Sequence, residues 1–127
     1  MTFILGTRSV AKLKGVHPDL IRVVARAILI TPVDFVVTEG LRTLARQKEL
    51  LAAGATTTLK SRHLTGHAVD LAPVVGATVR WDWPMFDMLI PAVKRAADEC
   101  GVACEFGYDW TRFRDGPHVQ LNWGQYP

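Results

Sequence analysis

The sequence predicts an α+β fold, in which a small, mainly antiparallel sheet packs with about three helices. Apolar residues recur at helical spacing in three stretches, short apolar runs typical of strands lie between and after them, and Gly or Pro marks most boundaries. The chain has 127 residues, of which 49% are hydrophobic, so folding can bury a core without further support. We therefore expect residues 1–127 to form one domain.

The first helix and strand are expected within the first forty residues. His17 can cap the helix, and Pro18 suits its first turn. Pro32 requires the helix to end before it. Residues 35–38 then predict a short buried strand. The apolar face of this helix is expected to contain Leu20, Val24 and Ile28.

The second helix is expected from a cap at Thr43 to about Ala53, with Gly54 stopping it. Residues 55–61 are small or hydroxylated and predict a loop. Residues 68–74 are apolar apart from one aspartate and predict a strand, with which residues 79–81 are expected to pair.

The third helix is expected after Asp82, with Pro84 near its first position and Gly101 at its end. Pro91 lies inside this pattern, and we expect it to kink the helix. Two further strands are predicted after it, over residues 102–106 and 118–122. Cys100 and Cys104 flank the end of this helix, and we expect two partly buried thiols there, although one disulfide is arithmetically possible.

Charge and hydropathy exclude several classes of protein. The net charge is +3, and the basic residues are scattered rather than clustered, which argues against nucleic-acid binding. No apolar stretch reaches the length of a membrane span, so we expect no stable membrane insertion. The N-terminus lacks a basic start, and its apolar run covers residues 3–5 only. We therefore expect no signal peptide and synthesis in a cytoplasm.

Two segments contain the candidate metal-binding and catalytic residues. His63 and Asp70 lie seven residues apart on either side of Gly66, and Asp70 interrupts an apolar strand. A carboxylate in such a strand is costly to bury unless it is paired or binds a metal. Asp115 and His118 precede and begin another apolar strand. Two imidazoles and one carboxylate suit a catalytic zinc site, but histidines of this kind are also common as surface or core residues, so spacing alone leaves both interpretations open.

The first segment resembles the motif Ser-x-His-x-x-Gly-x-Ala-x-Asp of the LAS-type zinc peptidases. This family includes D-Ala-D-Ala carboxypeptidases, D-Ala-D-Ala dipeptidases and the L-alanyl-D-glutamate peptidases that serve as phage endolysins. The second segment resembles the acid-x-x-His motif of the same family, and its Asp with a Pro before His is most similar to the endolysin branch. Residues 107–113 also resemble that branch. The first motif is matched by Ser61, His63, Gly66, Ala68 and Asp70.

The resemblance implies a role for each motif residue. His63, Asp70 and His118 would bind Zn²⁺ at the edge of the sheet, and Asp115 would act as general base and acid. Arg42 resembles the family arginine that steadies the substrate carbonyl or the oxyanion. His17 and His67 are not expected to be ligands. The four tryptophans could line a cleft, although core packing is the simpler expectation for most of them.

The endolysin branch implies hydrolysis of the L-Ala–D-Glu bond in peptidoglycan during bacteriophage release and host lysis. The enzyme would be made in the host cytoplasm and would reach the cell wall once a holin permeabilises the membrane; we expect a monomer. Two alternatives stay open. One is a D-Ala-D-Ala carboxypeptidase, and the other is a zinc-stabilised wall-binding module without catalysis, against which the presence of Asp115 argues.

Overall fold

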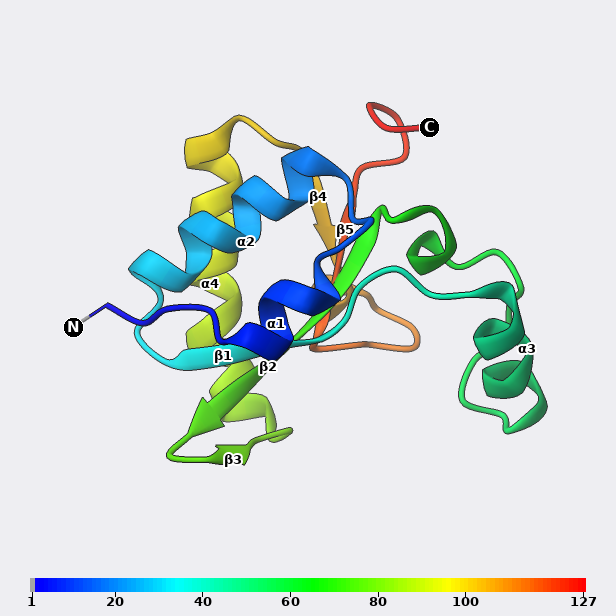
Figure 1. Cartoon of the computed structure of the whole chain (residues 1–127), viewed down its shortest axis with the longest axis horizontal. Coiled ribbons are helices and arrows are strands. Elements are labelled where there is room, and N and C mark those ends of the chain that lie inside the picture. The colour runs from blue at the N-terminus through cyan, green and yellow to red at the C-terminus, as the bar shows by residue number, and fades with distance from the viewer. Residues whose placement is uncertain (1) are drawn as a thin grey trace.

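A five-stranded antiparallel sheet forms the centre of the computed structural model, which describes residues 2–127 (Figure 1). The strand order is β1-β2-β5-β4, and β3 pairs with the far end of β2. β2 and β5 are therefore the two central strands of the main sheet. The strands are β1 (Asp34–Glu39), β2 (Ala68–Val75), β3 (Thr78–Val79), β4 (Cys104–Phe106) and β5 (His118–Leu121).

Four α-helices surround this sheet in the described residues, one more than the sequence predicted. The additional helix is α1, which is only six residues long and therefore too short to show a helical period. Its Ser9 hydroxyl accepts a hydrogen bond from the backbone N–H of Val37, at 3.0 Å, and so ties α1 to β1. The helices are α1 (Thr7–Lys12), α2 (Pro18–Ile30), α3 (Leu44–Ala52) and α4 (Trp83–Cys100), with 3-10 turns η1 (Arg62–Thr65) and η2 (Gly107–Asp109).

The predicted helix boundaries are confirmed at three points. His17 Nδ1 accepts a hydrogen bond from the Asp19 N–H, and the Thr43 hydroxyl accepts one from the Arg46 N–H, so both residues cap their helices. Gly101 ends α4 in the left-handed conformation. α4 is one continuous helix on both sides of Pro91.

The core lies between the sheet and the helices α2 and α4, which cover the same side of it (Figure 1). Side chains alternate between the faces of a strand, so every second residue of β2 and β5 enters this core. The intervening residues face the opposite side, toward α3 and the loops around it. Within residues 2–127, no helix is both long and apolar enough to cross a bilayer. The strand residues in the core include Val69, Leu71, Val119 and Leu121.

Candidate active site

The three predicted ligands converge on one point. The Asp70 Oδ1 atom lies 3.3 Å from His63 Nε2 and 3.4 Å from His118 Nδ1. One ligand atom from each residue can be chosen so that all three lie within 4.8 Å of one another. Both imidazoles are buried, and Asp70 is partly exposed. The sequence-predicted set is therefore brought together by the fold.

Each of these side chains is positioned by a different local element. His63 lies in η1, which ends at Gly66 in a left-handed conformation. A Cβ at Gly66 would lie 2.4 Å from the Gly15 carbonyl oxygen, so only glycine fits this turn. Asp70 and His118 are direct partners across the β2–β5 pair, which places both on the same face of the sheet.

The convergence point lies on the central strands β2 and β5, on the face that α2 and α4 leave uncovered. It opens into a cleft of about 880 Å³. Residues 54–61, after α3, and residues 110–115, before β5, form much of the lining of this cleft. Figure 1 shows α3 standing apart from the other helices on this side of the sheet.

Hydrogen bonds fix the orientation of both imidazole rings. His63 Nδ1 lies 2.9 Å from the carbonyl oxygen of Gly40, and His118 Nε2 lies 2.8 Å from Gln120 Oε1. Because both partners are acceptors, each ring donates through that nitrogen and turns its other nitrogen toward Asp70. Holding a ligand in one tautomer in this way is typical of metal-binding histidines.

The partner of His118 is itself held in place. Gln120 Nε2 donates to Glu105 at 2.8 Å, and Asn122 donates to the other oxygen of the same carboxylate at 3.0 Å. Glu105 lies on β4 and is paired with Gln120 across the β4–β5 ladder. The amide of Gln120 therefore has one orientation that satisfies both neighbours, with its oxygen toward His118.

The charges at the convergence point favour an ionised carboxylate. Burial raises the pKa of Asp70, but hydrogen bonds from His118 and His63 outweigh it and hold this pKa well below its usual range. Burial lowers the pKa of His118, and the hydrogen bond and charge of Asp70 reverse this and raise it above its ordinary value. The two imidazoles thus stabilise the Asp70 carboxylate in the protein itself, at the position where a bound metal ion would stabilise it.

The residues present fit a divalent transition metal. Two neutral imidazoles and one carboxylate are the ligand types that zinc prefers, and three protein ligands leave a coordination position for water or substrate. The contacts to Gly40 and Gln120 orient the two ring nitrogens that face Asp70. Trp110 packs against the His118 ring at a centroid distance of 5.2 Å and shields one side of the site.

Asp115 lies beside this cluster on the wall of the cleft. Its backbone N–H donates to the Gly107 carbonyl, and its carbonyl accepts from the His118 N–H, so the carboxylate is tied to β5. Within residues 2–127 the carboxylate has no hydrogen-bond partner. Burial and the charge of Asp70 raise the pKa of Asp115, against the opposing effect of His118, His63 and Arg42.

Comparison with known proteins decides the family. The family model for the phage L-alanyl-D-glutamate peptidases matches residues 1–121. The chain belongs to this family. An L-alanyl-D-glutamate peptidase of Escherichia phage T5 is 34% identical over 99% of this chain and 94% of its own length. One from Listeria phage A118 is 33% identical over 74% of this chain, which spans only 32% of that longer protein.

A solved structure agrees with the same assignment. The L-Ala D-Glu endopeptidase ChiX of Serratia marcescens superposes with a TM-score of 0.91 at 49% sequence identity. The match covers 95% of this chain and 91% of that one. The α+β fold and the family resemblance predicted from the two motifs are thus confirmed.

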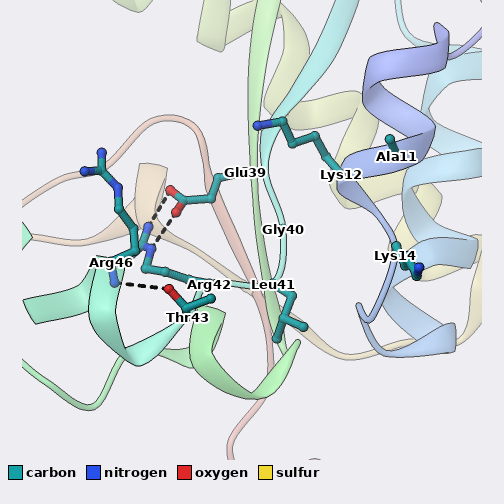
Figure 2. Close-up of a pocket in the computed structure, with 9 residues that line it drawn as sticks. All are labelled: Ala11, Lys12, Lys14, Glu39, Gly40, Leu41, Arg42, Thr43 and Arg46. Atoms are coloured by element: carbon teal, nitrogen blue, oxygen red, sulfur yellow. Dashed lines mark hydrogen bonds and ion pairs between the residues drawn. The ribbon is translucent and has the colours of Figure 1, made fainter. Parts of the chain in front are cut away.

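In this family member, Arg42 is part of a fixed ion pair at the cleft. Its Nε and Nη2 donate to the two oxygens of Glu39, each at 2.6 Å, as Figure 2 shows. Its Nη1 donates to Gln47 Oε1 at 2.7 Å and lies 3.5 Å from the Ser61 hydroxyl. A guanidinium has five N–H donors, so one remains for a substrate oxygen.

A second hollow, of about 390 Å³, lies beyond the backbone of residues 40–43 (Figure 2). It contains none of the three candidate ligands, and it shares only Glu39 and Arg42 with the cleft. The cleft that contains the ligand cluster is therefore the candidate active site of this peptidase.

Several site residues were missed in the sequence. Gly40 orients His63, and a Cβ there would lie 2.0 Å from the Lys12 carbonyl oxygen, which explains the glycine. Gln47 is fully buried and connects Arg42 to the Thr58 carbonyl. Gln120 lies two residues after His118 on β5, which places both side chains on one face of the sheet.

The remaining predicted residues lie outside the ligand cluster. His67 contacts Thr65 through Nδ1 and packs near His17, whose ring contacts Tyr126. Cys100 and Cys104 are free thiols and partly buried, as expected. The expectation that most tryptophans pack in the core is wrong, because the structure exposes Trp81, Trp83 and Trp123.

Proposed function

We propose that this chain is a zinc-dependent endopeptidase that hydrolyses the L-Ala–D-Glu bond of the peptidoglycan stem peptide, with residues 1–127 as its catalytic domain. The observation that carries the proposal is the convergence of His63, Asp70 and His118 in the cleft, with Asp115 beside them. Membership of the phage L-alanyl-D-glutamate peptidase family supports the choice of bond. The same family membership favours this reaction over D-Ala-D-Ala carboxypeptidase activity and over a non-catalytic wall-binding module.

The three ligands would hold the ion, and the ion would supply a Lewis acid that acidifies water and polarises the scissile carbonyl. His63 and His118 are already oriented for this by Gly40 and Gln120. The Asp70 carboxylate contributes negative charge, which increases affinity for a cation at the convergence point.

Asp115 is proposed as the general base and acid. Its raised pKa brings the carboxyl closer to neutral pH, where a base accepts a proton and can later return it. In the proposed reaction Asp115 takes the proton of the attacking water and then protonates the leaving amine of D-Glu. No other side chain of the described residues bonds this carboxylate, so it is available for both transfers.

Arg42 is proposed to stabilise the carbonyl oxygen as negative charge develops on it. Glu39, Gln47 and Ser61 hold its guanidinium in one orientation at the cleft. We propose that the remaining N–H of the Arg42 guanidinium donates a hydrogen bond to the substrate carbonyl oxygen. A donor fixed before the reaction needs no reorganisation during it.

The biological setting is proposed from the phage relatives. We propose that the enzyme is a phage or prophage endolysin that acts as a monomer, and that a holin gives it access to the wall from the host cytoplasm. Expression with and without a holin tests this route: lysis is expected only with the holin, and rapid lysis without it would refute the route.

Digestion of purified peptidoglycan tests the activity itself. We expect new amino termini of D-Glu, loss of cleavage with a zinc chelator, and recovery when zinc is added back. Release of free D-Ala without stem cleavage would instead establish a carboxypeptidase. No cleavage by a protein that binds zinc would refute catalysis.

A further inference from the structure

Five cationic side chains line the cleft, and three of them are already bonded within the protein. Arg42 is paired with Glu39. Arg62 donates to the carbonyls of Leu121 and Tyr126 and lies 3.8 Å from the centroid of the Trp123 ring. These two guanidinium groups therefore have structural partners.

Arg114 is bonded in a similar way. Its Nε donates to the Tyr108 carbonyl at 3.0 Å, and its guanidinium lies 4.0 Å from the centroid of the Trp83 ring. Lys60 and Arg112, the other two cations, have no side-chain hydrogen bond or ion pair within the part of the chain that the structure describes. Both are exposed, and both line the cleft that contains the ligand cluster.

These two unpartnered cations come from separate segments. Lys60 lies in the loop that follows α3, and Arg112 lies in the loop that leads to Asp115. Among the cleft carboxylates, Glu39 is bonded by Arg42 and Asp70 by the two imidazoles, and Asp115 forms no hydrogen bond or ion pair with Lys60 or Arg112 within the described residues. The cleft therefore offers positive charge on two segments of its lining for an anion that is not part of this chain.

The loop that holds Arg112 has an anchored base and a strained tip. Its base is fixed by Arg114 and by the hydrogen bond from the Asp115 N–H to the Gly107 carbonyl. At its tip, Phe113 has a φ of 53° and is 82% exposed. A bulky residue rarely adopts positive φ, and burial of its ring does not compensate here. Strain of this kind is concentrated where residues contact a ligand.

We propose that Arg112 and Lys60 bind the free carboxylate of the D-glutamyl residue that follows the scissile bond. This inference rests on the proposed function. Glutamate has two carboxyl groups and the peptide chain uses one of them, so a free carboxylate lies next to the bond that is cut. An arginine fork binds a carboxylate through two parallel hydrogen bonds, and a lysine adds a compact charge. The pair selects substrates with an unmodified D-Glu.

Two synthetic stem peptides test this selection. Both contain the L-Ala–D-Glu bond; in one the glutamyl carboxylate is free, and in the other it is a carboxamide. Rates of cleavage by the zinc-loaded protein give kcat/KM for each peptide. We expect the free carboxylate to be preferred by about tenfold or more, the effect of one charge-assisted hydrogen bond.

Substitution of the two cations should remove the preference. In the double variant Arg112→Gln/Lys60→Gln, kcat/KM is expected to fall for the carboxylate peptide, mainly through KM, and to stay nearly constant for the carboxamide peptide. Arg8→Gln is the matched control, since it removes the same charge from an exposed site outside the cleft. It should keep the native ratio.

The outcomes separate this inference from the function on which it rests. Cleavage of both peptides at equal rates by the native protein, or an unchanged ratio in the double variant, would overturn the carboxylate site and leave the peptidase activity standing. Cleavage of neither peptide, together with intact peptidoglycan, would overturn the proposed function and this inference with it.

Discussion

The two faces of strands β2 and β5 differ completely in their chemistry, although they share one backbone. On the face toward α2 and α4, Leu71 and Val119 are fully buried in the apolar core. On the other face, the neighbouring residues Asp70 and His118 contribute two of the three candidate ligands. Core residues and candidate site residues thus alternate along the same strands, and we expect single substitutions to separate stability from the proposed catalysis.

The apolar core also helps to fix the relative positions of the candidate ligands Asp70 and His118. Asp70 and His118 are cross-strand partners, and the ladder that joins them is held by apolar residues on its far side. The positions of Asp70 and His118 therefore depend on the packing of apolar side chains that are not themselves candidate ligands. We infer that removal of the metal leaves the fold intact and abolishes only the proposed hydrolysis in the cleft.

The largest expected effect is on kcat, from a substitution in the cleft, on the face of the sheet that α2 and α4 leave uncovered. Asp115→Asn keeps the size of the side chain and removes the base, so kcat is expected to fall by about 10²- to 10⁴-fold. Zinc content and thermal unfolding should match those of the native protein, because Asp115 is outside the ligand set. Peptide cleavage assays with parallel metal analysis give both values. Native kcat in this variant would exclude Asp115 from the mechanism.

On the covered face, Leu71→Ala should act in the opposite way. It removes a fully buried side chain next to Asp70 and is expected to destabilise the protein by about 2–5 kcal/mol. Denaturant unfolding measures this loss. Where the variant is folded, its kcat per bound zinc should stay close to native. A large loss of kcat with native stability would show that the two faces are not separable.

A smaller effect, on zinc affinity, is expected from Gln120, which hydrogen-bonds to the candidate ligand His118. Gln120→Ala removes the acceptor that orients His118 and should weaken zinc binding by about 10- to 100-fold. Competition with a chelating dye measures the affinity. Gln125→Ala, on an exposed residue near the C-terminus, serves as a control and should bind zinc normally. Equal affinities in both variants would contradict a role for Gln120 in orienting the ring.

The smallest effect concerns one thiol on the covered side. Burial, with a further contribution from Cys100, raises the pKa of Cys104 to about 12. The thiolate is the reactive form, so Cys104 should be alkylated slowly at pH 8, and the rate should rise with pH toward that value. Labelling of the Cys100→Ser variant, native and unfolded, isolates this residue. Labelling as fast in the native state as in the unfolded state would contradict the burial of this thiol.

The sequence predicted the cluster of candidate ligands because its motifs are local. His63, Asp70 and His118 lie beside or within apolar strands, where an unpaired polar group is costly, and the two motifs placed them in a family. The helix caps at His17 and Thr43 were also predictable, since capping depends on a few neighbouring residues.

The rest depends on pairing between distant segments. That the site lies on central strands follows from the order β1-β2-β5-β4, which periodicity does not reveal. The partners Gly40 and Gln47 act on His63 and Arg42 through the fold, and a short helix such as α1 shows no period. Trp81 and Trp83 lie just before and at the start of α4, and their exposure depends on packing with distant segments that the sequence pattern does not show.

The most direct test of the account is a calorimetric zinc titration of the metal-free protein alongside its Asp70→Ala variant. We predict that the native chain binds one zinc ion, and that the variant binds none tightly while its far-UV circular dichroism stays native. A native chain that binds no zinc, or a variant that binds it with equal affinity, would contradict the assignment of His63, Asp70 and His118 as the metal site.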